Sequence, residues 1–108
     1  MKGYKGFELD MTCRGFQYAI GETYTTDKPI ALCVHGFHFC KYIEYCFYYY
    51  PYDTSIFAEV EAIGDVFKGS DGKCVTNAIK IIRILSPLEI KDLIAARQYY
   101  TCRECILN

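Results

Sequence analysis

The chain has 108 residues, 52% of them apolar and 17% aromatic, which predicts one globular domain over residues 1–108 and excludes a disordered chain. Twelve basic residues against thirteen acidic ones leave a net charge of −1, and no two basic residues are adjacent. The basic surface of a general nucleic-acid binder is therefore missing. No segment has the length of a membrane span and the start lacks a signal-peptide pattern, so we expect a cytoplasmic protein without membrane contact.

Three strands are predicted in the first forty residues. Residues 2–7 and 13–20 are short, aromatic and interrupted by glycine, which is typical of strands joined by tight turns. The chain turns near Pro29, and residues 30–39 alternate well enough to form a third strand. Gly36 within it indicates a bulge or a close approach of another backbone segment.

A short helix is predicted in the segment KYIEYCFYYYP, residues 41–51. Apolar side chains recur there at helical spacing, and Pro51 ends the element because proline lacks a backbone N–H. The recurring positions are Tyr42, Ile43, Cys46, Phe47 and Tyr50.

Two further strands and a turn are predicted in the second half. Residues 56–63 alternate regularly, which indicates a half-buried strand. GSDG at 69–72 predicts a turn. Residues 78–85 are apolar on both faces, as expected of a strand inside a sheet.

A second helix is predicted at the end of the chain. Ser86 is an N-cap, Pro87 takes the first helical position and Glu89 completes a capping box, so the helix begins here and runs to about Arg97. Its apolar face contains Leu88, Ile90, Leu93 and Ile94. The order of elements predicts an α+β fold, a small and mainly antiparallel sheet with two short helices.

The seven cysteines are predicted to be reduced. Their odd number and the lack of an export signal favour free thiols that pack as small apolar side chains. They are Cys13, Cys33, Cys40, Cys46, Cys74, Cys102 and Cys105.

The segment CVHGFHFC, residues 33–40, holds both histidines and two of the cysteines. On an extended strand Cys33 and His35 share one face while His38 and Cys40 share the other, so the four side chains cannot bind one zinc ion together. His38 and Cys40 would lie about 7 Å apart, too far for direct proton transfer. The simpler interpretation is that His38 bonds to backbone and Cys40 packs.

The pair Cys102 and Cys105 has the spacing of zinc ligands and of a redox dithiol. A zinc site that combines this pair with His38 and Cys40 is the alternative to our expectation of no metal. No strand–helix–strand context surrounds the pair, which favours the end of a helix over a redox motif.

Tyrosine is concentrated in residues 42–52. We expect an exposed protein-contact surface there, since tyrosine offers a large contact area at low entropic cost, and the acidic neighbours disfavour stacking on nucleic acid. The predicted binding residues are Tyr45, Tyr48, Tyr49 and Tyr52. A homodimer through this surface is an alternative.

The series GYKGF (3–7), MTCRGFQYAIGETY (11–24), LCVHGFHFC (32–40), YYP (49–51), FAEVEAIGDV (57–66) and TNAIKI (76–81) resembles a small domain family of unknown function from phages, prophages and bacteria. This resemblance covers nearly the whole chain. It implies a phage or mobile-element setting inside a bacterial host cell.

A second resemblance is local. GFHFC with the Tyr-rich segment after it, and later FAEVEAIGDV, are similar to segments of ADP-ribosyltransferases. The resemblance implies a reduced form of that fold, with Arg14 as an NAD-anchoring residue and His38 or Phe39 in place of the tyrosine that stacks on nicotinamide. The late carboxylate that this family needs could only be Glu89, which the capping box already uses.

Two functions follow as expectations. The first is non-enzymatic binding to a bacterial host protein, such as inhibition of a host-defence factor, with no cofactor and no catalytic residue. The alternative is an NAD-using enzyme or nucleotide binder that relies on Arg14 and His38.

Overall fold

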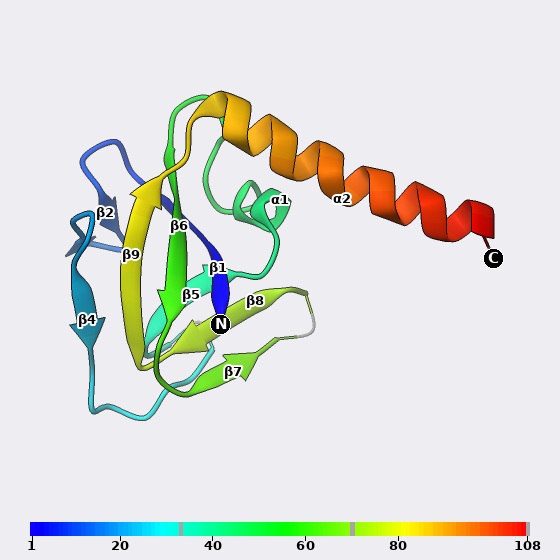
Figure 1. Ribbon diagram of the computed structural model, residues 1–108. Coiled ribbons are helices and arrows are strands. Elements are labelled where there is room, and N and C mark those ends of the chain that lie inside the picture. The colour runs from blue at the N-terminus through cyan, green and yellow to red at the C-terminus, as the bar shows by residue number, and fades with distance from the viewer. Residues whose placement is uncertain (33, 70, 108) are drawn as a thin grey trace.

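A computed structural model describes the backbone of residues 1–32, 34–69 and 71–107, with side chains up to Arg97 outside the two gaps. Seven strands of this described chain form one antiparallel sheet in the order β4-β9-β6-β1-β5-β8-β7 (Figure 1). Their bounds are β1 Lys2–Phe7, β4 Thr23–Thr25, β5 Phe37–Cys40, β6 Ile56–Ala62, β7 Val66–Lys68, β8 Lys73–Thr76 and β9 Ala78–Ile84. The predicted α+β class with a mainly antiparallel sheet is confirmed.

The strands predicted at 2–7, 56–63 and 78–85 are present as β1, β6 and β9, next to one another in the sheet. Along β6, Ala58 and Val60 face one core cluster, whereas Phe57 faces a second. This is the two-sided alternation that the sequence predicts.

The prediction of a single strand over residues 13–20 is wrong. β2 (Thr12–Cys13) and β3 (Phe16–Gln17) form a tight hairpin instead, because Arg14 (φ 53°) and Gly15 (φ 80°) both adopt left-handed backbone conformations. Two successive residues with positive φ are the requirement of a type I′ two-residue hairpin turn. This turn, rather than a strand, positions the side chain of Arg14.

The strand predicted at 30–39 is too long, since among the described residues of that segment only those of β5, Phe37–Cys40, lie in a strand. Gly36 precedes it with φ 110°, and a Cβ there would lie 2.6 Å from a side-chain carbon of Val75 and 3.0 Å from the carbonyl of Thr76. The predicted close backbone approach is confirmed. Strands β4, β7 and β8 are absent from the sequence prediction because segments of three or four residues show no reliable alternation. Of the turn predicted at 69–72 between β7 and β8, Ser70 lies outside the described residues, and the Gly69 N–H donates to the Lys73 carbonyl at 2.7 Å.

Both predicted helices are present, with different lengths. α1 spans only Ile43–Cys46, while α2 spans Pro87–Leu107 and runs well past Arg97. The capping box is confirmed, because the Ser86 N–H donates to Glu89 Oε1 at 3.1 Å and the Glu89 N–H donates to Ser86 Oγ at 3.2 Å. Leu88 was predicted to lie on the apolar face of this helix, but it is 67% exposed and does not belong to that face. No helix in the described part of the chain is long and apolar enough to cross a membrane.

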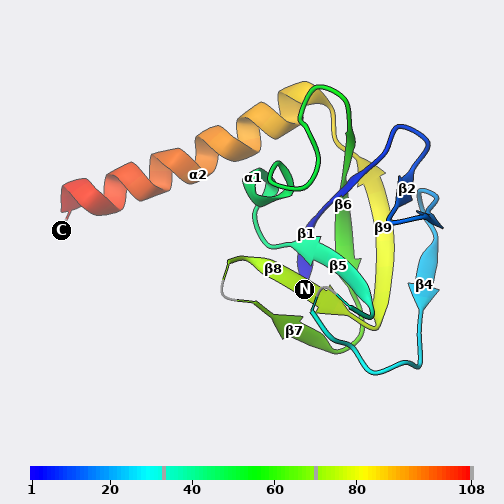
Figure 2. The same ribbon diagram turned by 180° about the vertical axis from the view of Figure 1, so that it is seen from behind.

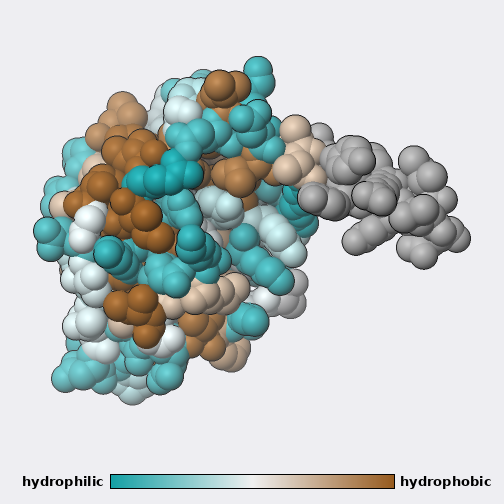
Figure 3. All heavy atoms as spheres, viewed as in Figure 1, coloured by the Kyte–Doolittle hydropathy of each residue, from teal (hydrophilic) through white to brown (hydrophobic). Residues whose placement is uncertain are grey.

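The sheet carries a core on each side. One cluster includes Phe7, Phe39 and Ile81, and the other joins Phe57 to α1 and the first turns of α2. Figures 1 and 2 show α1 between the sheet and α2, and α2 projecting away from the sheet. Figure 3 shows apolar side chains gathered on the surface over β9.

Candidate functional site

The ladder between β1 and β5 is interrupted. These neighbouring strands pair only at Tyr4 and Cys40, although continued antiparallel register would bring Gly6 opposite His38. β1 remains fully paired with β6 on its other side, from Lys2 to Phe7. The sheet therefore opens between β1 and β5 just beyond that single pair.

A cavity of about 500 Å³ occupies this opening. Its walls are three consecutive residues of each separated strand, closed by the β2 hairpin, by α1 with the turns after it, and by β8. The lining residues are Tyr4, Lys5, Gly6, Glu8, Cys13, Arg14, His38, Phe39, Cys40, Cys46, Tyr49, Tyr50 and Lys73. The volume is in the range of small-molecule sites.

Lys5 is the most unusual residue of the cavity, because a lysine is rarely buried. Its side chain is 4% exposed, and its Nζ donates to the carbonyl of His38 at 2.5 Å, at the position where the ladder to β1 is missing. The ammonium also lies 5.2 Å from the ring centroid of Tyr18, within cation–π distance. Burial lowers the pKa of Lys5, while the nearby thiol of Cys13 opposes that shift.

Two further cations line the cavity. Arg14 is placed by the strained hairpin turn, and Lys73 lies at the start of β8 with its Nζ 4.5 Å from the ring centroid of Tyr49. The pKa of His38 is lowered to about 4, first by desolvation and then by the charges of Lys5, Lys73 and Arg14. His38 is therefore neutral near pH 7 and reports a positive potential in the cavity.

Three of the buried cysteines also line the cavity. The Tyr50 hydroxyl donates to Cys13 Sγ at 3.1 Å, which together with burial raises the pKa of Tyr50. Hydrogen bonding with Cys46 lowers the pKa of Cys40, and hydrogen bonding with Cys40 together with burial raises that of Cys46. The described cysteines are free thiols, as predicted.

The structure brings together several residues that the sequence singled out separately. Arg14, His38 and Phe39, which the ADP-ribosyltransferase resemblance picks out, all line the cavity, and His38 and Cys40 share a face as expected. Sequence reasoning missed Lys5. The available signal was its alternation with Gly3 and Phe7 along a predicted strand, which puts a lysine on a core-facing side.

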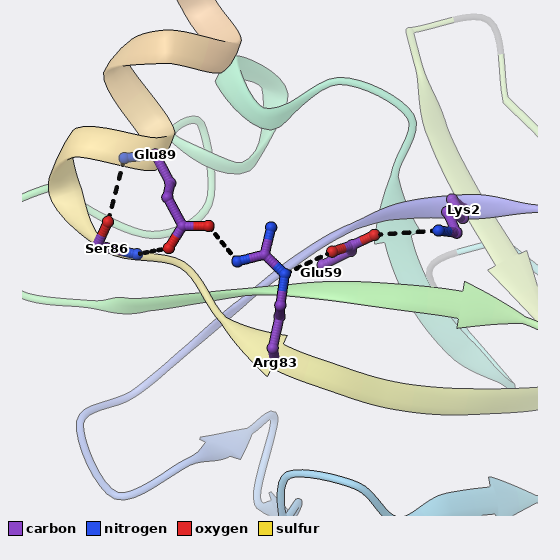
Figure 4. Close-up of polar contacts among 5 residues, drawn as sticks. All are labelled: Lys2, Glu59, Arg83, Ser86 and Glu89. Atoms are coloured by element: carbon purple, nitrogen blue, oxygen red, sulfur yellow. Dashed lines mark hydrogen bonds and ion pairs between the residues drawn. The ribbon is translucent and has the colours of Figure 1, made fainter.

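Glu89 does not line this cavity. It forms an ion pair with Arg83, whose Nε donates to Glu59 Oε2 at 2.9 Å, and Glu59 in turn lies 3.5 Å from Lys2 Nζ (Figure 4). Glu89 thus completes the capping box and ends an alternating chain of charges. It is not placed as a carboxylate for NAD chemistry at Arg14.

The tyrosines of the predicted contact surface divide into two groups. Tyr48, Tyr49 and Tyr52 are 80%, 49% and 44% exposed, and Tyr49 also lines the cavity. Tyr45 is half-buried, with its ring 6.3 Å from that of Tyr48 and its hydroxyl accepting from Arg97. Tyr45 therefore contributes to the packing of α1 against α2 as well as to the surface.

The side chains of Cys102 and Cys105, and the whole of Cys33, lie outside the described residues. Both predictions that involve the terminal pair, zinc binding and a redox dithiol, concern that region and stay predictions. Among the side chains that the structure describes, no group of three or more His, Cys, Asp and Glu could hold a metal ion.

Comparison with known proteins gives a family but no described relative. A search of curated proteins and a search of solved structures found no match. The family described as Domain of unknown function (DUF7666) matches residues 1–96, which contain every element from β1 to the first turns of α2 and every residue that lines the cavity. The chain belongs to this domain family of unknown function.

Proposed function

We propose that the chain binds a small phosphate-bearing molecule in the cavity between β1 and β5. The observation that carries this proposal is the convergence of Lys5, Arg14 and Lys73 on one volume of about 500 Å³. Glu8 is the one carboxylate among the described lining residues. An anion would offset these positive charges, which lower the pKa of His38 after desolvation, the larger cause.

The aromatic lining favours a nucleotide over inorganic phosphate. Phe39, Tyr49 and Tyr50 line the same cavity, and aromatic side chains stack on a base whatever its identity. A volume of about 500 Å³ accommodates a base and a phosphate together. Since Glu89 lies in the Arg83 network instead, we propose binding without an ADP-ribosyl transfer step.

The test uses His38 as an internal reporter. Its pKa is followed by NMR with adenosine monophosphate, with inorganic phosphate and with adenosine. Adenosine monophosphate should raise this pKa from about 4, because a bound anion favours the imidazolium. Phosphate should do so more weakly, and adenosine should not. The signal of exposed His35, which does not line the cavity, is the reference. An unchanged His38 at millimolar nucleotide, or equal affinity for adenosine, would contradict the proposal.

A variant of the hairpin turn separates binding from folding. Arg14→Asn keeps a residue that tolerates positive φ, so the hairpin turn and the folded state should be retained. The affinity for adenosine monophosphate should fall about tenfold, because a charged hydrogen bond contributes on the order of 1.5–3 kcal/mol. Lys80→Gln, at an exposed position of β9 outside the cavity, is the matched control and should change neither quantity.

Contact with a protein partner is a second candidate, favoured by the exposure of Tyr48, Tyr49 and Tyr52. Aromatic side chains exposed together are typical of protein interfaces. A bacterial host protein is the partner that we expect. Tyr48→Ala should then abolish stoichiometric capture of one identified protein while Arg14→Asn retains it. Retention by Tyr48→Ala and loss by Arg14→Asn would assign the contact to the cavity.

A further inference from the structure

Tyr50 is held in the cavity by contacts with two of its walls. Its backbone N–H donates to the carbonyl of Cys46, the last residue of α1, at 2.9 Å. Its hydroxyl donates to Cys13 Sγ, in the β2 hairpin, at 3.1 Å. The side chain is half-buried and lines the cavity. Tyr50 is therefore fixed at both ends within the proposed binding site.

The ring of Tyr50 lies against the backbone of β1 at Gly6. A Cβ at Gly6 would be 2.7 Å from Cδ2 and 2.9 Å from Cγ of that ring. Gly6 does not have a positive φ, so glycine is needed there for space rather than for its backbone conformation. Continued register would bring Gly6 opposite His38, where β1 and β5 have separated. One side of the ring is thus packed against β1 at the opening of the sheet.

Two other aromatic rings of the cavity are already engaged. Phe39 is 2% exposed and belongs to the core beneath the cavity. Tyr49 is 49% exposed, and Lys73 Nζ lies over its ring, 4.5 Å from the centroid. Phe39 is therefore enclosed by neighbouring side chains, and one face of Tyr49 is taken by a cation.

Tyr4, the fourth aromatic residue of the cavity, is shared with another part of the surface. It also lines a second hollow of about 340 Å³ together with Glu59 and Arg83, and Tyr50 is not among the residues of that hollow. In the described part of the chain no ring–ring contact involves Tyr50. Tyr50 thus combines a fixed position with a ring that an aromatic ligand can contact.

We propose that Tyr50 is the residue on which the base of a purine nucleotide stacks, with the phosphate directed to the cations of the cavity. This inference rests on the proposed function and names the class of nucleotide that the site takes. Stacking on an aromatic side chain tolerates every base but varies in strength with the base. Purines have two fused rings and pyrimidines one, so purine nucleotides should bind more tightly. The Tyr50 hydroxyl is already donated to Cys13, so it does not distinguish adenine from guanine.

Substitutions at Tyr50 test the stacking role, with affinities measured by calorimetry on the full chain. Tyr50→Leu keeps an apolar side chain without an aromatic ring, so its affinity for adenosine monophosphate should fall about tenfold. Its affinity for ribose-5-phosphate, which has no base, should not change. Tyr50→Phe keeps the ring and loses only the bond to Cys13, so it should retain nucleotide binding. Phe67→Leu, at an exposed position of β7 outside the cavity, is the matched control and should bind both ligands as the unmodified chain does.

A measurement on the unmodified chain does not depend on the folding of any variant. With isotope-labelled aromatic rings, nuclear Overhauser effects are recorded by NMR between the base protons of adenosine monophosphate and the rings of the protein. Contacts with the ring of Tyr50 are expected. Contacts only with Tyr4, Phe39 or Tyr49 would assign the base to another ring and overturn the proposal.

A series of nucleotides tests the class of ligand. Adenosine and guanosine monophosphates should bind with similar affinity, whereas cytidine and uridine monophosphates should bind more weakly, because a single ring offers less stacking surface. In Tyr50→Leu the difference between the two groups should largely disappear. Equal affinity of the unmodified chain for all four nucleotides would show that the site does not select purines.

Failure of this inference can be told apart from failure of the proposed function. If adenosine monophosphate binds equally well to Tyr50→Leu and its base does not contact the ring of Tyr50, the stacking role is wrong and the nucleotide site remains. If ribose-5-phosphate binds the unmodified chain as tightly as adenosine monophosphate, the cavity binds phosphate without reading a base, and the purine class is wrong. A chain that binds neither ligand would overturn the inference and the proposed function together.

Discussion

Two charged regions of this molecule use similar side chains in opposite ways. On the surface, Lys2, Glu59, Arg83 and Glu89 alternate in sign, so that each charge has an opposite neighbour (Figure 4). In the cavity, cations from β1, the β2 hairpin and β8 surround a volume with a single carboxylate among its described lining residues. The first arrangement alternates in sign, whereas the second gathers cations around one cavity.

Burial makes this difference important. Exposed ion pairs contribute little to stability because water screens them and side-chain entropy opposes them. A buried cation such as Lys5 costs free energy unless it is compensated, and the His38 carbonyl and the Tyr18 ring provide part of that compensation.

The largest expected effect comes from removing the buried cation. Lys5→Met keeps the length of the side chain without its charge, and adenosine monophosphate affinity, measured by calorimetry, should fall at least tenfold, since a hydrogen bond to a charged group contributes about 1.5–3 kcal/mol. The midpoint of urea unfolding should stay the same or rise, because replacing a buried charge with an apolar group is often neutral or stabilising. Loss of stability with affinity retained would show that Lys5 is a structural residue and would contradict the contrast between the surface charges and the cavity charges.

An intermediate effect on folding stability is expected from a change in pH. The pKa of His38 is lowered from the ordinary 6.5 to about 4, chiefly by desolvation, so between these values the unfolded chain binds more protons than the folded chain. The contribution of His38 to stability is full above about pH 6.5 and is lost as the pH falls toward 4. Urea unfolding at a series of pH values should show this slope. His38→Gln should reduce it, and an identical slope in the variant would place its origin in other groups.

The smallest effect is expected at the surface network. Arg83→Gln removes the central cation between Glu59 and Glu89, yet the melting temperature should fall only slightly because both pairs are exposed. Adenosine monophosphate affinity should not change. A large loss of stability would show that this network, rather than the cores, holds β9 to α2, and a loss of affinity would connect the two charged regions.

The sequence predicted the elements that depend on local pattern. β6 and β9 follow from alternation, and the start of α2 follows from Ser86 and Glu89, whose hydrogen bonds are made within one turn. It did not predict the hairpin at Arg14, because a left-handed arginine departs from the usual preference for glycine or asparagine. The length of α1 was also misjudged, since aromatic residues at helical spacing can equally pack around turns.

The candidate site shows the same division between features that local sequence predicts and features that it does not. Residues close together in the chain were enough to infer the capping box, the reduced state of the described cysteines and the close backbone approach at Gly36. The cavity could not, because it exists where β1 and β5, more than thirty residues apart, pair once and then separate. Only that separation leaves the His38 carbonyl to Lys5. Local patterns determine which elements form, whereas the register between distant strands decides which side chains meet, because it depends on the packing of the whole sheet.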